Sequence, residues 1–185
     1  MRTFLAADID NKVNEKIKDF MDRCRLMDRS VKWGKADTSH VTIYFFGEVE
    51  EKNIKVLEGT VSEALKQIVP FEASAARISA FPSMKGPRVF WIGIENRTHE
   101  LEKIYESIKT DLPGKKIKVN IESKDYTPHL TIGRVKGRCD PETIRRMSAC
   151  SETEFGSFVI DKIILYQSIL RKEGPMYSPL KVFQL

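Results

Sequence analysis

Two segments of this 185-residue chain open with the same four-residue frame, His-x-Thr-Ile, one in each half of the sequence. The first begins the apolar run HVTIYFFG at 40–47, and the second begins HLTIGRV at 129–135. Each run has the apolar character of a strand that is buried in a sheet. The chain has only three histidines, so chance alone would very rarely place two of them in this frame. The repeat therefore predicts two equivalent strands, one from each half of the chain.

Helical and strand patterns alternate around these two runs. Apolar residues recur at three- and four-residue steps after Asp10, which is a suitable helix N-cap, and again after Thr98. Helices are expected at 10–27, 51–68, 98–112 and 141–150. Strands are expected at 3–9, 30–33, 40–47, 71–81, 88–95, 116–123, 129–135, 158–170 and 180–185. This order predicts an α+β or mixed-sheet protein, built as one large domain or two small lobes.

Composition narrows the class of protein. Hydrophobic residues make up 41% of the chain and charged residues 31%, which is typical of a folded globular protein. No apolar run approaches the roughly 18 residues of a membrane span, and the opening MRTFLAADID lacks the pattern of a secretory signal. Three cysteines without a CxxC pair indicate reduced thiols, as expected in the cytoplasm. The net charge of +5 mildly favours anionic partners.

The spacing within the frame suits phosphodiester chemistry. Residues i and i+2 of a strand share a face, so His40 lies beside Thr42, and His129 beside Thr131. If the strands lie side by side or facing each other, two imidazoles and two hydroxyls meet in one cleft. A neutral imidazole can accept a proton from an attacking oxygen, a protonated one can give a proton to a leaving oxygen, and threonine hydroxyls can bind phosphate oxygens. This chemistry needs no metal.

Two other interpretations of the frame are weaker. A single His-x-Thr in a strand is usually only a half-buried polar face, but two copies at strand openings argue against that interpretation. Two histidines without a neighbouring carboxylate also make a poor zinc site. Asp8 and Asp10 could supply oxygen ligands, yet they fall where a strand ends and a helix begins, which explains them better.

Longer segments carry a resemblance to a known family. HVTIYFFGEV at 40–49 and YTPHLTIGRV at 126–135 resemble the two motifs of the 2H phosphoesterases. FPSMKGPRVFWIGIE at 81–95 is similar to a further segment of that family, and so are VKW at 31–33 and the stretch LYQSIL…GPMYSPL at 165–180. The most similar branch is the RNA 2′,3′-cyclic phosphodiesterases, long called 2′-5′ RNA ligases. The resemblance extends over nearly the whole chain.

The resemblance implies a fold and an activity. The fold would be α+β and bilobal, with two pseudo-symmetric lobes of mostly antiparallel sheets and flanking helices, in a single domain spanning 1–185. The active cleft would lie between the lobes. The activity would be hydrolysis of a 2′,3′-cyclic phosphate at an RNA end to a 2′-phosphate, without a cofactor. The implied protein is a cytoplasmic monomer that binds such RNA ends, does not contact membranes and has no obligate protein partner.

The resemblance also implies individual roles. His40 falls on the position of the proton donor to the leaving 3′ oxygen, and His129 on that of the proton acceptor that activates water. Thr42 and Thr131 fall on phosphate-binding hydroxyls, and Arg134 on a substrate-binding arginine. From the residues alone, the donor and acceptor cannot be told apart. A strand would also turn Arg134 away from His129, unless the chain bends between them at Gly133.

Other residues and functions stay open. Trp33 is expected to pack at the core or rim, with base stacking as the alternative. Phe45 is expected in the core, and Tyr126 is a possible substrate contact near the second motif. His99, at the first turn of a helix, is expected to be solvated. Besides hydrolysis, the chain could join RNA ends through a 2′-5′ bond without ATP, or bind RNA ends without catalysis.

Overall fold

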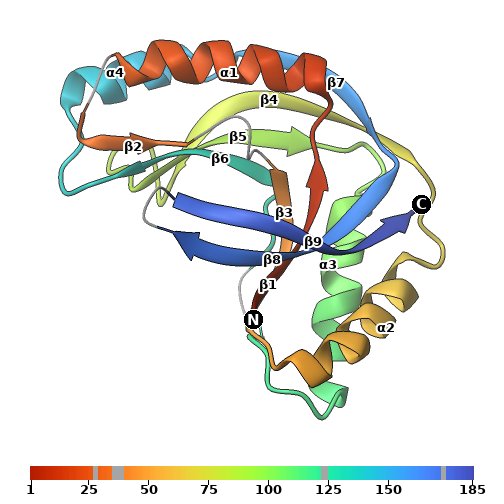
Figure 1. Cartoon of the computed structure of the whole chain (residues 1–185). Coiled ribbons are helices and arrows are strands. Elements are labelled where there is room, and N and C mark those ends of the chain that lie inside the picture. Colours follow the sequence, from red (N-terminus) through yellow and green to blue (C-terminus); the bar gives the residue numbers. More distant parts are fainter. Residues whose placement is uncertain (27–28, 35–39, 122–124, 172–173) are drawn as a thin grey trace.

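The strands form two antiparallel sheets in the computed structural model, which describes residues 1–26, 29–34, 40–121, 125–171 and 174–185 (Figure 1). The four-stranded sheet has the order β3 (His40–Glu48), β1 (Arg2–Asp8), β8 (Lys162–Arg171) and β9 (Gly174–Gln184). The five-stranded sheet has the order β2 (Val31–Trp33), β6 (His129–Val135), β5 (Val89–Glu95), β4 (Phe71–Phe81) and β7 (Glu154–Ile160). The two histidine-bearing strands, β3 and β6, belong to different sheets and are in contact.

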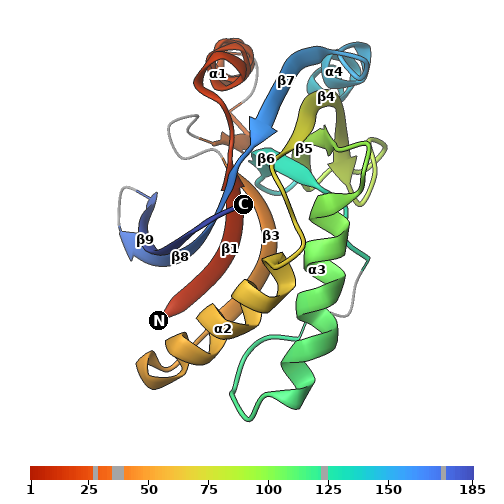
Figure 2. The ribbon, with the colours of Figure 1, turned by 90° about the vertical axis from the view of Figure 1, so that its right-hand side faces the viewer.

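Helices cover each sheet and complete two lobes. Contacts with β2, β7 and β4 place α1 (Asn11–Arg25) and α4 (Pro141–Ala149) on the five-stranded sheet. The other pair, α2 (Ile54–Leu65) and α3 (Glu100–Asp111), packs together beside β3, as Figure 2 shows. Short 3-10 turns occupy Glu51–Asn53 and Leu112–Gly114. The expected α+β, two-lobed architecture is confirmed.

The lobes are interleaved along the chain and do not correspond to its halves. Strand β1 lies in the four-stranded sheet, but the helix that follows it covers the five-stranded one. A single residue, Asp161, separates β7 from β8, and these strands belong to different sheets. The prediction of one strand at 158–170 was therefore wrong. Apolar residues continue across the crossing, since Ile160 is buried in one lobe and Ile163 in the other, so the pattern hides the break.

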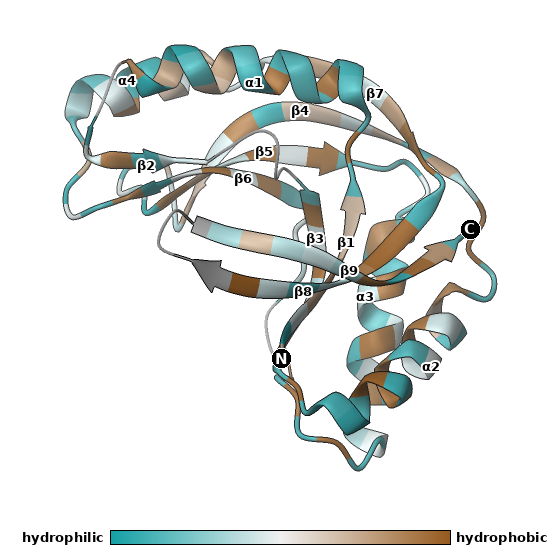
Figure 3. Cartoon of the chain, in the orientation of Figure 1, coloured by the Kyte–Doolittle hydropathy of each residue, from teal (hydrophilic) through white to brown (hydrophobic). Residues whose placement is uncertain are grey.

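The first helix forms as its sequence predicts. The Asp10 side chain accepts a hydrogen bond from the backbone N–H of Lys12, and this satisfies one of the free donors at the helix start. Figure 3 shows hydrophilic and hydrophobic residues alternating along α1, as an amphipathic helix requires. The predicted apolar stripe is buried, and its described members are Val13, Ile17, Phe20, Met21 and Cys24. Met27, the last predicted member, lies outside the described residues.

Two local predictions were wrong. Thr98 does not cap α3, which begins at Glu100 after His99 in a left-handed conformation. The buried Asn96 side chain instead accepts a hydrogen bond from the backbone N–H of Leu101. The residue that caps α3 with its side chain therefore lies two positions before Thr98. The stretch 116–121 forms no strand, although the Asn120 backbone N–H donates to the carbonyl of Phe46. Residues 122–123 of that predicted strand lie outside the described residues.

Among the helices of the described residues, none combines the length and apolar character that crossing a membrane would require.

Candidate active site

The two repeated frames have the same burial pattern in their strands. In β3, His40 and Thr42 are half-buried, whereas Val41 and Ile43 are fully buried. In β6, His129 and Thr131 are half-buried, and the residues after each of them are buried. The period of two thus anchors each strand in a core and turns its histidine and threonine to the opposite face. The prediction that histidine and threonine share a face is confirmed in both strands.

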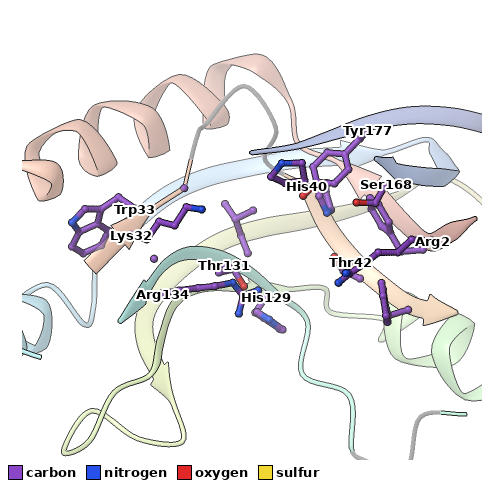
Figure 4. A pocket seen from close by; sticks show the side chains of 16 residues that line it. Arg2, Lys32, Trp33, His40, Thr42, His129, Thr131, Arg134, Ser168 and Tyr177 are labelled. Atoms are coloured by element: carbon purple, nitrogen blue, oxygen red, sulfur yellow. The ribbon is translucent and has the colours of Figure 1, made fainter. Parts of the chain in front are cut away.

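These faces meet in one pocket of about 450 Å³ between the lobes, within the size range of ligand-binding clefts (Figure 4). The four-stranded sheet contributes His40 and Thr42, and the five-stranded sheet contributes His129 and Thr131. Further lining residues come from both sheets and include Arg2, Phe4, Lys32, Trp33, Phe45, Arg134, Ser168 and Tyr177. All five residues that the sequence nominated for the site therefore line a single pocket.

His129 has a defined orientation and a defined tautomer. Its Nδ1 lies 2.7 Å from the backbone carbonyl oxygen of Thr127, and because a carbonyl can only accept, Nδ1 must carry the proton. The neutral ring therefore has its lone pair on Nε2. The rings of Phe81 and Trp91 meet the imidazole edge to face, at centroid distances of 5.1 and 6.0 Å. Burial lowers the pKa of His129, and the nearby positive charge of Arg134 lowers it further.

His40 is held by stacking on aromatic rings. Its imidazole stacks on Phe4 at a centroid distance of 4.8 Å, and Tyr177 meets it edge-on at 4.9 Å. Asp8 is its cross-strand partner on β1, and the carboxylate of Asp8 accepts a hydrogen bond of 2.9 Å from the hydroxyl of Tyr166, whose ring lies 6.3 Å from the imidazole. The residues that enclose His40 thus come from β1, β8 and β9, which are distant from it in the sequence.

A β-bulge turns Arg134 into the pocket. In the pairing of β5 with β6, Trp91 lies opposite Thr131 and Phe90 opposite Gly133, so Ile132 is an extra residue on β6. Thr131 and Arg134 consequently face the same side, although three positions separate them. Gly133 permits this because a Cβ there would lie 2.8 Å from the side chains of both Trp33 and Val31. The bend that the sequence allowed at Gly133 is present, in the form of this bulge.

The charges that line the pocket favour anionic ligands. Arg2, Lys32 and Arg134 line it, and none of them pairs with a carboxylate in the described part of the chain. No aspartate or glutamate occurs among the described residues that line the pocket. The hydroxyls of Thr42 and Thr131 also have no hydrogen-bond partner within the described ranges, so they can donate to a ligand.

Sequence reasoning missed several lining residues. Arg2, Ser168 and Tyr177 were not singled out, and Phe45 was assigned to the core although it lines the pocket. The period of two on β1 places Arg2 on the face of Phe4, but this signal acquires meaning only when the pairing of β1 with β3 is known. Ser168 and Tyr177 are likewise a cross-strand pair between β8 and β9.

The remaining aromatic candidates are placed as follows. Trp33 is half-buried, lines the pocket and stacks on Phe90 at 5.9 Å, so the expected rim packing is confirmed. Tyr126 does not line the pocket; its hydroxyl donates a hydrogen bond of 3.0 Å to the carbonyl oxygen of Thr42, and its ring stacks on Tyr105 at 4.8 Å. Burial raises the pKa of this hydroxyl. Tyr126 thus connects the loop before His129 to the strand of His40.

The arrangement is chemically suited to a phosphate ester. It presents two imidazoles from opposite sheets, two available hydroxyls and three cations, and the described residues that line the pocket include no carboxylate. Within the described ranges, no group of three or more His, Cys, Asp or Glu side chains is placed to hold a metal ion. His99, the third histidine, is exposed at the residue before α3, and its Nδ1 lies 3.2 Å from Glu102 Oε1, away from the pocket.

Comparison with known proteins finds a matching family and named relatives of similar length. The model of the 2′-5′ RNA ligase superfamily matches residues 13–169. A protein from Archaeoglobus fulgidus named RNA 2′,3′-cyclic phosphodiesterase is 36% identical over 184 residues, which cover 100% of both chains. A protein of the same name from Methanothermobacter thermautotrophicus is 30% identical over 187 residues, covering 100% of this chain and 99% of the relative.

Solved structures share the fold. The protein TT0787 of Thermus thermophilus aligns with a TM-score of 0.84 at 23% identity, covering 100% of this chain and 98% of that one. Escherichia coli LigT complexed with 3′-AMP aligns with a TM-score of 0.78 at 20% identity, covering 100% and 97%. Two antiparallel sheets that interleave along the chain are therefore common to these proteins.

Proposed function

Because this chain belongs to the 2′-5′ RNA ligase superfamily, the 2H phosphoesterases, we propose that it hydrolyses RNA 2′,3′-cyclic phosphate ends to 2′-phosphate ends by acid–base catalysis with two histidines. The relatives named RNA 2′,3′-cyclic phosphodiesterase, matched over their whole length, support the substrate. We also propose that residues 1–185 act as one bilobal domain, since the pocket needs both sheets.

One observation carries the assignment of roles. The hydrogen bond from His129 Nδ1 to the Thr127 carbonyl leaves Nε2 as the only basic nitrogen, and the lowered pKa keeps the ring neutral near pH 7. A neutral imidazole with a free Nε2 suits the acceptor of a proton from water. His40 faces the same pocket from the other sheet and is the remaining imidazole for the donor role.

The reaction then takes one displacement at phosphorus. His129 Nε2 accepts a proton from water as the water oxygen forms a bond to phosphorus. The bond from phosphorus to the 3′ oxygen breaks, and protonated His40 gives its proton to that oxygen. The product carries a 2′-phosphate and a free 3′-hydroxyl. Proton transfer from His129 back to His40 through solvent restores both starting states.

The other lining groups stabilise the charge that grows on the phosphate oxygens. The hydroxyls of Thr42 and Thr131 donate hydrogen bonds to the two non-bridging oxygens, one from each sheet. The guanidinium of Arg134 adds a positive charge on the side of His129, where the attacking oxygen enters. No step needs a metal ion, so we expect the reaction to proceed in the presence of a chelator.

The test offers the protein an oligonucleotide that ends in a 2′,3′-cyclic phosphate, with EDTA present. We expect the ring to open and a 2′-phosphate to form, identified by phosphorus NMR and by its resistance to enzymes that need a 3′-phosphate. Formation of a 3′-phosphate, or strict dependence on a metal, would contradict the mechanism. The same assay with an added 5′-hydroxyl RNA separates hydrolysis from 2′-5′ joining, and salt-sensitive binding without product would indicate a noncatalytic module.

A further inference from the structure

The pocket holds more positive charge than one reacting phosphate requires. A cyclic phosphodiester carries a single negative charge, whereas Arg2, Lys32 and Arg134 all line the pocket without a carboxylate partner in the described residues. Arg134 accounts for one of these charges, since it lies close enough to His129 to lower that pKa. Arg2 and Lys32 come from different sheets and belong to opposite walls of the pocket, as Figure 4 shows. Either could bind a second phosphate of the RNA.

The proposed roles of the histidines decide between these two walls. In a displacement at phosphorus, the attacking and leaving oxygens lie on opposite sides of the phosphorus atom. Water enters beside His129, so the 3′ oxygen leaves beside His40. The 3′ oxygen is part of the ribose, and the ribose carries the rest of the RNA chain. The RNA therefore extends from the phosphate over the four-stranded sheet, which is the sheet of Arg2.

The position of Arg2 on β1 suits a phosphate next to the reacting one. Arg2 lies two residues before Phe4 on β1 and on the same face, so the two positions are about 7 Å apart along the strand. His40 pairs with Asp8 and its imidazole stacks on Phe4, so along β1 Arg2 lies on the far side of Phe4 from the proposed proton donor. An arginine beyond Phe4 suits a neighbouring phosphate of the strand, since the reacting phosphate lies between the two histidines. Lys32, in contrast, is on the five-stranded sheet with His129.

The guanidinium of Arg2 is also held in position. Its central carbon lies 5.0 Å from the centroid of the Phe45 ring, a cation–π contact. A second β-bulge, between Leu5 and Ala6 in the pairing of β1 with β3, turns Phe45 to the pocket face. An arginine held on an aromatic ring keeps its outer edge available for two parallel hydrogen bonds to phosphate oxygens.

We propose that Arg2 is a specificity-determining residue that binds the phosphodiester on the 5′ side of the terminal nucleotide, so that the site takes oligonucleotide ends in preference to cyclic mononucleotides. This inference rests on the proposed hydrolysis of 2′,3′-cyclic phosphates and names the part of the substrate that the pocket recognises beyond the reacting group. The upstream phosphodiester is the only charge that distinguishes a dinucleotide end from a cyclic mononucleotide.

The experiment compares two dinucleotides that both end in a 2′,3′-cyclic phosphate. One has the natural phosphodiester between its nucleosides, and the other has a neutral methylphosphonate there. For the unmodified protein we expect kcat/KM to favour the charged dinucleotide by roughly tenfold or more, the size of a hydrogen bond to a charged group. In Arg2→Gln this ratio should fall to near one, with the loss confined mainly to the charged substrate.

Lys32→Gln is the matched control, because it removes an equally unpaired cation from the opposite wall. We expect it to change kcat/KM for both dinucleotides by the same factor and so to leave their ratio as in the unmodified protein. Phe45→Leu keeps the charge of Arg2 but removes the ring beneath it, and should lower the ratio in part. A thermal melt of each variant shows whether it is folded.

The outcomes separate the inference from the function on which it rests. If no variant and no substrate gives product, the proposed hydrolysis is wrong. If both dinucleotides are hydrolysed equally by the unmodified protein, or if Arg2→Gln lowers both equally, hydrolysis stands and the role of Arg2 is refuted. A ratio that falls in Lys32→Gln instead would place the upstream chain on the five-stranded sheet and would also refute it.

Discussion

The two histidine strands carry the same four-residue frame but surround their histidines differently. The imidazole of His129 meets two aromatic rings edge to face and has its Nδ1 hydrogen-bonded to a backbone carbonyl. The imidazole of His40 stacks face to face on Phe4 and lies beside Tyr177 and Tyr166, the latter hydrogen-bonded to Asp8. The frame is symmetric, whereas its surroundings are not.

This difference shows where the chemical roles of a repeated motif come from. Two identical side chains can act as an acid and a base only if their environments hold them in different protonation states. Burial lowers the pKa of His129 and so favours its neutral ring, while the Thr127 carbonyl, which acts on that pKa in the opposite direction, selects the tautomer with a free Nε2. These features come from Thr127 and from strands β4 and β5, outside the frame itself. The repeat therefore supplies the two histidines, and the neighbouring strands decide which one acts as the acid and which as the base.

The largest effect should come from replacing each histidine by alanine. Loss of a general acid or base costs roughly 10² to 10⁴ in turnover. The two variants should differ in how their activity depends on pH. In the unmodified protein, activity should decline at acidic pH because the base becomes protonated, and His129→Ala should lose this decline. Since the pKa of His129 is lowered, the decline should lie below pH 6.5 in the unmodified protein. His40→Ala should lose the decline at alkaline pH.

Kinetics of cyclic phosphate hydrolysis across the pH range check this assignment. If His129→Ala keeps the acidic decline and loses the alkaline one, the two roles are reversed. If both variants lose the same limb, the asymmetry between the two strands has no chemical consequence.

The two threonines should behave alike, in contrast to the histidines. Thr42→Val and Thr131→Val each remove a hydroxyl that can donate to a charged phosphate oxygen, which corresponds to a loss of roughly 10- to 100-fold in kcat/KM. Neither change should shift the acidic or the alkaline decline of activity, because neither hydroxyl is hydrogen-bonded to an imidazole in the described residues. Serine at either position, which keeps the hydroxyl, is the control and should restore most of the activity. A loss at only one threonine would show that the symmetry of the frame fails for phosphate binding too.

A smaller effect is expected from Arg134, which acts on only one of the two histidines. Its positive charge lowers the pKa of His129. In Arg134→Gln that pKa should rise, so the acidic decline should move to higher pH by a fraction of a unit. Arg134→Lys keeps the charge and should keep the decline near its original pH. An acidic limb that stays in place in Arg134→Gln would show that solvent screens this exposed charge from His129.

The comparison also explains how much of the site could be predicted. The frame identified His40, Thr42, His129 and Thr131, because a period of two in a strand decides which side chains share a face. The inward turn of Arg134 depended on a bulge that the sequence only permitted at Gly133, since the unpaired Ile132 is a property of the pairing with β5. A single-strand pattern contains no information about that register.

The surroundings of His40 were beyond prediction for a similar reason. Phe4 and Tyr177 reach His40 because β1 and β9 belong to its sheet, and β9 lies at the far end of the sequence. The crossing at Asp161, which sends β8 to this sheet, was hidden in a continuous apolar run. Helices and strands follow from local periodicity, whereas the pairing of distant strands depends on packing across the whole molecule.

The smallest effect concerns the link between the two strands. The Tyr126 hydroxyl donates to the Thr42 carbonyl, so it ties the loop before His129 to the strand of His40. Tyr126→Phe keeps the stacking on Tyr105 and removes only this hydrogen bond, which contributes about 0.5–1.5 kcal/mol. We expect kcat to fall roughly two- to tenfold with KM and both pH limbs unchanged, because the histidines keep their own contacts while their spacing loosens. Tyr126→Leu, which also loses the stacking, should lower thermal stability further. If Tyr126→Phe lowers stability but leaves kcat unchanged, the hydrogen bond only supports the fold, and the separation of the two imidazoles must be set by the sheets alone.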